Sequence, residues 1–106
     1  MQFEFLEDRP RLSIKLTRDS VCAGDDVDAP HEKFIEIPSF TDPQAFSTHL
    51  AAGYLPSVAG IGHTWDCVLN GRLVGTILTN GFRSRIHEVN YADENHVHFR
   101  YHSAAY

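Results

Sequence analysis

The chain has 106 residues, of which 42% are hydrophobic, and it carries a formal net charge of −5. This length predicts one domain, residues 1–106, and its apolar runs are all shorter than the roughly 18 residues that a membrane span needs. The acidic balance excludes nucleic acid and anionic membrane as expected partners, because both are bound through basic patches. The first residues lack the pattern of a secretory signal, so we expect a cytoplasmic protein.

Two cysteines, Cys22 and Cys67, have neither the spacing of a metal knuckle nor that of a redox pair. We expect both to be reduced thiols, with a disulfide between them as the alternative.

The first strand is marked by alternation. Leu12, Ile14 and Leu16 alternate with polar residues after Pro10, which predicts a half-buried strand. Residues 3–6 alternate as well, and they predict either a separate short strand or an ordered tail.

An acidic loop is expected between residues 18 and 33, where the periodicity stops. Asp25, Asp26 and Asp28 repel one another unless a cation neutralises them, and Glu32 follows closely. These four carboxylates are the candidate contacts for a basic partner, with a solvated surface loop as the alternative. A divalent cation site is disfavoured, because the spacing does not match the twelve-residue calcium loop.

A short strand is predicted from Phe34 to Pro38, followed by one helix over Pro43–Ala52. Thr41 or Asp42 would cap the helix, with Gln44 in the position of a capping box, and Gly53 would end it. The apolar stripe consists of Phe46, Leu50 and Tyr54.

The strongest local signal is Asn70-Gly71, which predicts a hairpin within residues 65–78. A two-residue loop would pair Leu69 with Arg72. A three-residue loop would pair Leu69 with Leu73 and Trp65 with Ile77, and we favour it because it gathers the large apolar groups on one face.

The last strand, residues 96–102, places Val97, Phe99 and Tyr101 on one face and polar residues on the other, whereas residues 82–94 are ambiguous. The polar face holds three of the chain's seven histidines: His96, His98 and His102. They are candidate ligands for zinc or nickel, although Arg100 lies among them, and a polar outer face that protects a sheet edge is the commoner explanation.

Catalytic signatures are weak. Ser57 lacks the small-residue elbow of a hydrolase and neither cysteine has a local motif, so we expect a binding protein rather than an enzyme. The order of elements predicts the α+β class, with one helix on a mainly antiparallel sheet of about four to six strands in a β-grasp-like arrangement.

Residues 16–26 (LTRDSVCAGDD) and 54–60 (YLPSVAG), followed by Trp65 and the Asn70-Gly71 turn, resemble a group of small uncharacterised bacterial proteins. Some such proteins accompany polymorphic or contact-dependent toxins as immunity proteins. The resemblance implies a small acidic cytoplasmic protein that binds and blocks one partner, here a basic toxin domain.

Two other functions stay open: a metal-binding module or metal-dependent enzyme that uses the histidines of residues 96–102, and a subunit that joins an assembly through a strand edge.

Overall fold

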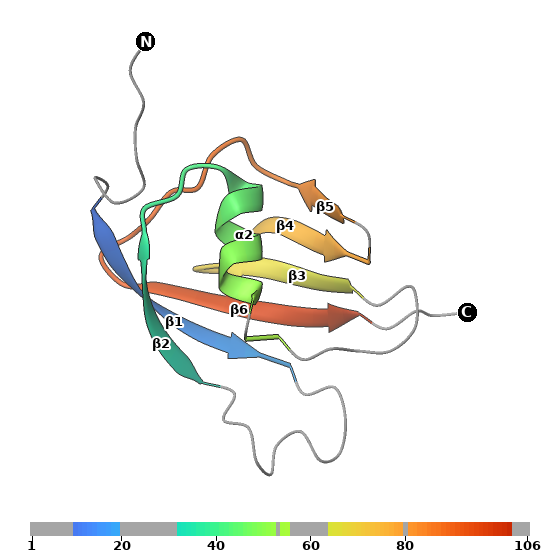
Figure 1. Ribbon diagram of the computed structural model, residues 1–106, viewed down its shortest axis with the longest axis horizontal. Coiled ribbons are helices and arrows are strands. Elements are labelled where there is room, and N and C mark those ends of the chain that lie inside the picture. Colours follow the sequence, from blue (N-terminus) through green and yellow to red (C-terminus); the bar gives the residue numbers. More distant parts are fainter. Residues whose placement is uncertain (1–9, 20–31, 53, 56–63, 80, 103–106) are drawn as a thin grey trace.

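The computed structural model describes residues 10–19, 32–52, 54–55, 64–79 and 81–102. Their elements, shown in Figure 1, are β1 (Arg11–Arg18), β2 (Lys33–Pro38), α2 (Pro43–Ala51), β3 (Thr64–Leu69), β4 (Arg72–Leu78), β5 (Gly81–Ser84) and β6 (Asn95–His102). Within these ranges no helix has the length and apolar character that crossing a membrane requires.

The strands form one six-stranded sheet in the order β2-β1-β6-β3-β4-β5. β1 and β6 run parallel, and every other neighbouring pair is antiparallel. The predicted α+β class, with a helix on a mainly antiparallel sheet, is therefore confirmed. The predicted strands within residues 12–16, 34–38 and 96–102 are confirmed as parts of β1, β2 and β6, while residues 3–6 lie outside the described ranges.

β6 is a central strand, not the edge strand that its polar row suggested. It pairs with β1 on one side and with β3 on the other, and the edges of the described sheet are β2 and β5. The reason lies on its other face, where Val97 and Phe99 are fully buried. A central position lets such side chains pack against neighbours on both adjacent strands, which favours it for β6.

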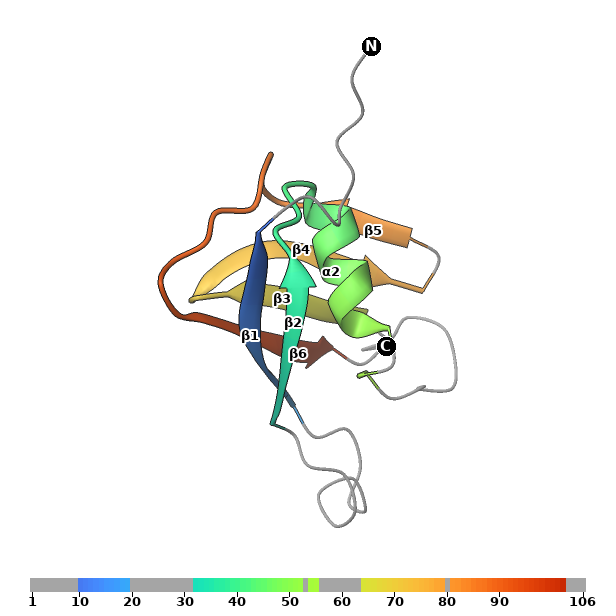
Figure 2. The same ribbon diagram turned by 60° about the vertical axis from the view of Figure 1, so that its left-hand side comes forward.

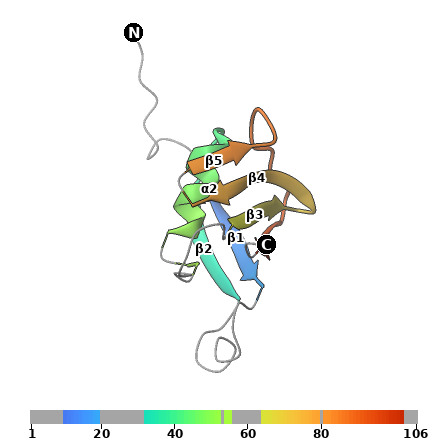
Figure 3. The ribbon, with the colours of Figure 1, turned by 90° about the vertical axis from the view of Figure 1, so that its right-hand side faces the viewer.

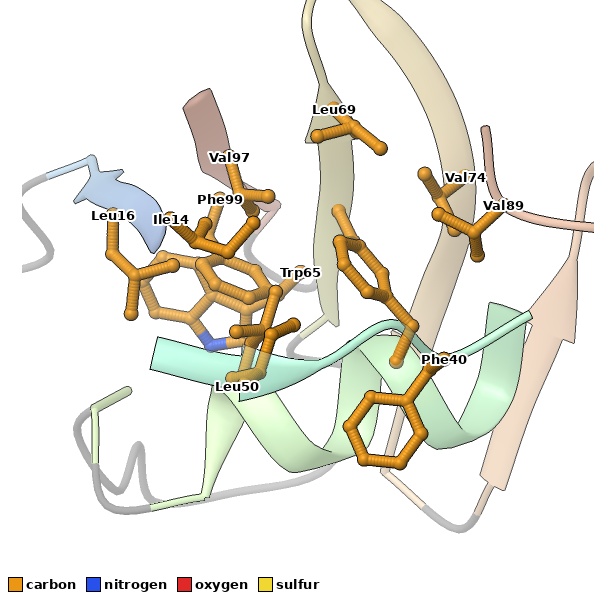
Figure 4. Close-up of a cluster of buried hydrophobic side chains, with 13 residues drawn as sticks. Ile14, Leu16, Phe40, Leu50, Trp65, Leu69, Val74, Val89, Val97 and Phe99 are labelled. Carbon is orange, nitrogen blue, oxygen red and sulfur yellow. The ribbon is translucent and has the colours of Figure 1, made fainter. Parts of the chain in front are cut away.

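The core lies between α2 and one face of the sheet (Figure 4). Because side chains alternate along a strand, the buried apolar side chains of the sheet point to this face. The buried apolar residues are Ile14, Leu16, Ile37, Phe40, Phe46, Leu50, Trp65, Cys67, Leu69, Val74, Val89, Val97 and Phe99. Cys67 is a free thiol inside this core, and Cys22 lies outside the described ranges.

Helix α2 begins at Pro43 as predicted, and of the two predicted caps the helix uses Asp42. The Asp42 carboxylate accepts a hydrogen bond from the Ala45 N–H at 2.8 Å, so Asp42 is the cap and the Thr41–Gln44 capping box does not form. Of the predicted stripe, Phe46 and Leu50 are buried and Tyr54 is partly buried against the core. The helix packs against β4 and β5, and the predicted terminator Gly53 lies outside the described ranges.

The predicted hairpin at Asn70-Gly71 is confirmed, with φ of 50° at Asn70 and 84° at Gly71. Its register combines both alternatives. Leu69 pairs with Arg72, as a two-residue turn requires, so the predicted Leu69–Leu73 pair is wrong. A bulge then shifts the register, and Trp65 pairs with Ile77 as predicted. The bulge thus reconciles a tight turn with an apolar inner face.

The ambiguous segment after the hairpin contains the short edge strand β5 and then an irregular connection to β6. The Val89 N–H donates to the Thr41 carbonyl at 2.9 Å, and the Tyr91 hydroxyl donates to the Phe40 carbonyl at 2.7 Å. These bonds fasten the connection to the chain just before α2. β6 therefore starts from a fixed point.

Gly75 in β4 tests how closely β4 and β5 pack against each other. A Cβ atom there would overlap Cζ of Phe82 and lie 2.7 Å from the Arg83 carbonyl oxygen. We expect Gly75→Ala to lower the free energy of unfolding by about 2 kcal/mol or more, as overpacking does. Urea unfolding followed by the fluorescence of the single tryptophan, Trp65, measures this.

Gly81→Ala is the matched control, because a Cβ at Gly81 meets nothing within 4 Å. It should change the free energy of unfolding by less than about 0.5 kcal/mol. Equal stabilities of the two variants would contradict the close approach at Gly75.

Candidate functional site

The sheet face opposite α2, called the open face from here on, has no helix over it in the described part of the chain (Figure 3). Its side chains alternate with the buried ones of each strand, which explains their polar character. They include Phe34 and Glu36 of β2; Ser13, Lys15 and Thr17 of β1; His96, His98, Arg100 and His102 of β6; Asp66 and the apolar Val68 of β3; and Thr76 of β4.

Asp66 is the centre of one cluster on the open face. It is only 8% exposed, and it accepts hydrogen bonds from Thr76 Oγ1 at 2.7 Å, His102 Nε2 at 2.8 Å and Arg100 Nη2 at 3.0 Å. Burial raises the pKa of the Asp66 carboxyl, but the three donors outweigh it, and the pKa lies below its ordinary value. Asp66 therefore remains an anion that orients the side chains of Arg100 and His102.

Asp19 is the centre of a second cluster, at the end of β1. One carboxylate oxygen accepts from His98 Nε2 at 2.8 Å and the other from the Tyr101 N–H at 3.0 Å. Burial works against ionisation here too, yet the bonds from Tyr101 and His98 hold the pKa of the Asp19 carboxyl below its ordinary value. Asp19 thus links the end of β1 to the end of β6.

Thr17 joins this cluster to a second imidazole. Its hydroxyl oxygen lies 2.7 Å from His98 Nδ1 and 2.7 Å from His96 Nε2. The Asp19 carboxylate can only accept, so His98 carries a proton on Nε2 and, when neutral, accepts at Nδ1 from the Thr17 hydroxyl. His96 must then donate from Nε2 to Thr17, and the four groups form one directed chain.

Folding favours the neutral form of His96, whose bond to Thr17 needs only the proton on Nε2. Burial, and then the charges of Lys15 and His98, lower the pKa of the His96 imidazole below its ordinary value. Its role in the described structure is that of a neutral hydrogen-bond donor to Thr17.

The three predicted metal ligands separate into two groups. His96 and His98 meet at Thr17, whereas His102 bonds to Asp66. Among the described residues, no group of three or more His, Cys, Asp or Glu side chains is placed to hold a metal ion. The histidine face exists as predicted, but the bonds to Thr17, Asp19 and Asp66 account for its geometry without a metal.

A groove of about 610 Å³ opens at one end of the open face. Its lining comes from β1, β2, the β3–β4 turn and the approach to β6: Ser13, Lys15, Phe34, Asn70, Asp93, Glu94, Asn95 and His96. Phe34 is 66% exposed, and it is the only large hydrophobic side chain so exposed in the described ranges. The groove therefore combines an aromatic group with charged ones.

Asn95 and Asn70 hold the groove wall in place. Asn95 Oδ1 accepts from the Ala92 N–H at 2.8 Å and from Asn70 Nδ2 at 3.1 Å, and Asn70 Oδ1 accepts from the His96 N–H at 2.8 Å. The turn that carries Asp93 and Glu94 is thereby tied to the β3–β4 hairpin. Both carboxylates are exposed, and neither makes an ion pair with any other described residue.

Of the predicted acidic contacts, only Glu32 is described. It forms an ion pair with Lys15 at 3.2 Å, so it neutralises the cation at the groove. Asp25, Asp26 and Asp28 lie outside the described ranges, and their role stays a prediction.

Nucleophilic catalysis finds little support in the described residues. Burial raises the pKa of the Cys67 thiol to about 12, so Cys67 is an unreactive core side chain. Both hydrogen-bonding functions of the Thr17 hydroxyl are already used. It donates its proton to His98 Nδ1 and accepts one from His96 Nε2. Ser57 lies outside the described ranges.

The sequence patterns missed three residues that organise the open face: Thr17, Asp19 and Asp66. Asp66 had a usable signal, since it is a carboxylate at an outward position between the apolar residues of a predicted hairpin strand. Asp19 and Thr17 had none, because their partners are distant in the sequence. The groove residues Asp93 and Glu94 had none either, because half of the groove lining, Ser13, Lys15, Phe34 and Asn70, is distant from them in the sequence.

No protein-family model matches the chain, and neither a curated protein nor a solved structure shows significant similarity to it. Its site is therefore interpreted from its own geometry.

The Asp66 cluster predicts a defined stability change. Asp66→Asn removes a carboxylate that three donors face, so we expect it to lower the free energy of unfolding at neutral pH by about 2 kcal/mol. Because the pKa of Asp66 is lowered by folding, its contribution is complete above the ordinary value of 3.8 and is lost as pH falls through the folded-state pKa. Urea unfolding of both proteins over this pH range measures it.

Asp93→Asn is the control on the same face, because Asp93 has no ion pair with any other described residue, and its effect should be within about 0.5 kcal/mol. A deficit of Asp66→Asn that persisted undiminished at acid pH would contradict the assignment.

The hydrogen-bond chain predicts imidazole tautomers. At about pH 8.5, where imidazoles are generally neutral, His96, His98 and His102 should all carry the proton on Nε2. Long-range ¹H–¹⁵N correlation spectra of the imidazole rings distinguish the two tautomers directly. A proton on Nδ1 of His98 would contradict the bond to Asp19.

Proposed function

We propose that this chain is a binding protein, not an enzyme, and that it holds a basic protein partner in the groove of its open face. The observation that carries the proposal is the combination, in one groove, of exposed Phe34 with two carboxylates, Asp93 and Glu94, that have no counter-charge among the described residues. An aromatic anchor beside charged groups is typical of a protein interface.

The charge balance of the groove favours a basic partner. Lys15 is its one lysine or arginine, and Glu32 already pairs with it. Asp93 and Glu94 therefore leave the groove negative, in keeping with the net charge of −5 of the whole chain. Opposite charge on a partner would speed the encounter and fix its orientation.

The groove is also pre-organised. Asn95 and Asn70 fix the turn that carries the two carboxylates, so little freedom is lost when a partner binds. Enzymatic use has no comparable support, because the polar groups of the open face are paired with one another rather than directed at a shared point in the groove.

The finer proposal is that the partner is a toxin domain and that the chain is its immunity protein. The resemblance of residues 16–26 and 54–60 suggests it, and a toxin that acts on nucleic acid has the basic cleft that such a groove would meet. Asp25, Asp26, Asp28 and Glu32 are proposed as further contacts, because their carboxylates suit a basic partner and Glu32 already reaches Lys15 of the groove lining. An immunity protein of this kind acts in the cytoplasm, and we propose that location.

The β-grasp-like arrangement also stays a proposal. It is supported by a first hairpin, β1–β2, followed by α2 and by a last strand that returns parallel to β1. The metal-binding alternative has weaker support, since His102 lies with Asp66 and apart from the other two histidines.

The test uses co-expression with the polypeptide encoded beside this chain in its native genome. We expect growth rescue and a co-purifying complex with the wild type. The double variant Asp93→Asn/Glu94→Gln should weaken the purified complex by about tenfold or more and flatten its salt dependence, as loss of facing charges does. Isothermal titration at two salt concentrations measures both.

Glu88→Gln is the control, because Glu88 is exposed and is not part of the groove lining. The triple variant Asp25→Asn/Asp26→Asn/Asp28→Asn tests the acidic segment in the same assay. Wild-type affinity of the groove variant would refute the groove, and absence of rescue by the wild-type chain would refute the immunity function.

A further inference from the structure

Besides the groove, the sheet edge formed by β2 is a second surface with exposed groups that could bind a partner. β2 is an edge strand of six residues, and no described strand lies beyond it (Figure 2). The opposite edge, β5, has four residues. A long edge with free backbone groups is a template for another strand, and proteins usually shorten or block it.

The alternation of an antiparallel pair shows which backbone groups point outward. The Ser39 N–H donates to the Pro10 carbonyl at 3.0 Å, so Ser39 and Pro10 form a hydrogen-bonded pair. Hydrogen-bonded pairs recur every two residues along an antiparallel ladder. The pairs Ile37–Leu12 and Ile35–Ile14 are therefore hydrogen-bonded as well. The N–H and C=O groups of Phe34 and Glu36 therefore face away from β1. The Glu36 carbonyl accepts one bond from Arg11 Nη2 at 3.1 Å, and its second lone pair remains.

The side chains of β2 are compatible with a second copy of the same strand. Pairing between copies must keep inward residues opposite inward ones, and the registers that also overlap most of residues 32–38 are centred on Phe34, Ile35 or Glu36. Centring on Phe34 places Glu32 opposite Glu36, and centring on Glu36 places two glutamates opposite each other. Like charges directly opposite are destabilising, so the register centred on Ile35 is favoured.

In that register the outward backbone groups of Phe34 and Glu36 find partners. Phe34 of one copy faces Glu36 of the other, Ile35 faces Ile35 on the two-fold axis, and Lys33 faces Ile37. The two Phe34 rings become diagonal neighbours on the open face, within reach of aromatic side chains. The side chain that is 66% exposed in the single chain thus gains its own copy as a neighbour.

We propose that two copies of this chain associate through antiparallel pairing of their β2 strands, centred on Ile35. The two sheets join into one continuous sheet, and the two grooves lie on the same face on either side of the paired Phe34 rings. The contact is a short strand pair, so it forms a weak dimer whose population rises with protein concentration.

Disulfide trapping tests the register. In a background with Cys22→Ser, which leaves only buried Cys67, Ile35→Cys should form a disulfide-linked dimer under mild oxidation. Residues facing each other in a non-hydrogen-bonded pair have Cα atoms about 4.5 Å apart, within disulfide range. Phe34→Cys and Glu36→Cys should not crosslink, because their copies lie two positions out of register, beyond about 7 Å.

Sedimentation equilibrium of the purified chain, without any partner, tests the dimer itself. Phe34→Lys, at a side chain outside the core, should raise the dimer Kd by about tenfold or more. Ser84→Lys adds the same charge at the exposed β5 edge and should leave the Kd unchanged. The groove variant Asp93→Asn/Glu94→Gln should dimerise as the wild type does.

A chain that sediments as a monomer at every concentration, with no Ile35→Cys crosslink, would overturn the proposal and leave the groove results standing. A crosslink through Glu36→Cys or Phe34→Cys in place of Ile35→Cys would overturn the register.

Discussion

The pairing of β6 with both β1 and β3 is the constraint on which the described structure depends. It is the only strand in these ranges that joins the β1–β2 hairpin to the β3–β4–β5 strands. One face of β6 buries Val97 and Phe99, and burying two such side chains contributes about 3–6 kcal/mol. Because side chains alternate along a strand, the same burial fixes the histidines and Arg100 on the open face. Core formation and surface chemistry are therefore set by one strand.

The polar side chains of the open face are organised by carboxylates. Asp66 and Asp19 each receive several donors, and these bonds keep their pKa values low despite burial. Each carboxylate thereby orients an imidazole, His102 for Asp66 and His98 for Asp19. Charged groups that already bond to one another within the open face have few free hydrogen-bonding positions for a ligand. The groups without partners, at the groove and at the β2 edge, are consequently the better candidates for recognition.

Phe34 connects these two surfaces. Its side chain lines the groove, while its backbone groups belong to the free edge of β2. A dimer through β2 would leave Asp93 and Glu94 accessible, because they stand on the turn before β6 at the far wall of the groove. Two grooves of one sign would then face the same direction, which suits a partner that is itself dimeric or that bears an extended basic surface.

Local signals in the sequence determined the elements: alternation in β1 and β6, the helix stripe of Phe46 and Leu50, and the turn at Asn70-Gly71. These features depend on neighbours within a few positions, so the chain itself specifies them. The tertiary structure alone decided the neighbours of β6, the bulge that sets the β3–β4 register, the bonds of Asp19 and Asp66, and the groove. Each of these joins residues far apart in the chain, and their proximity follows from how the whole core packs, which no local pattern contains.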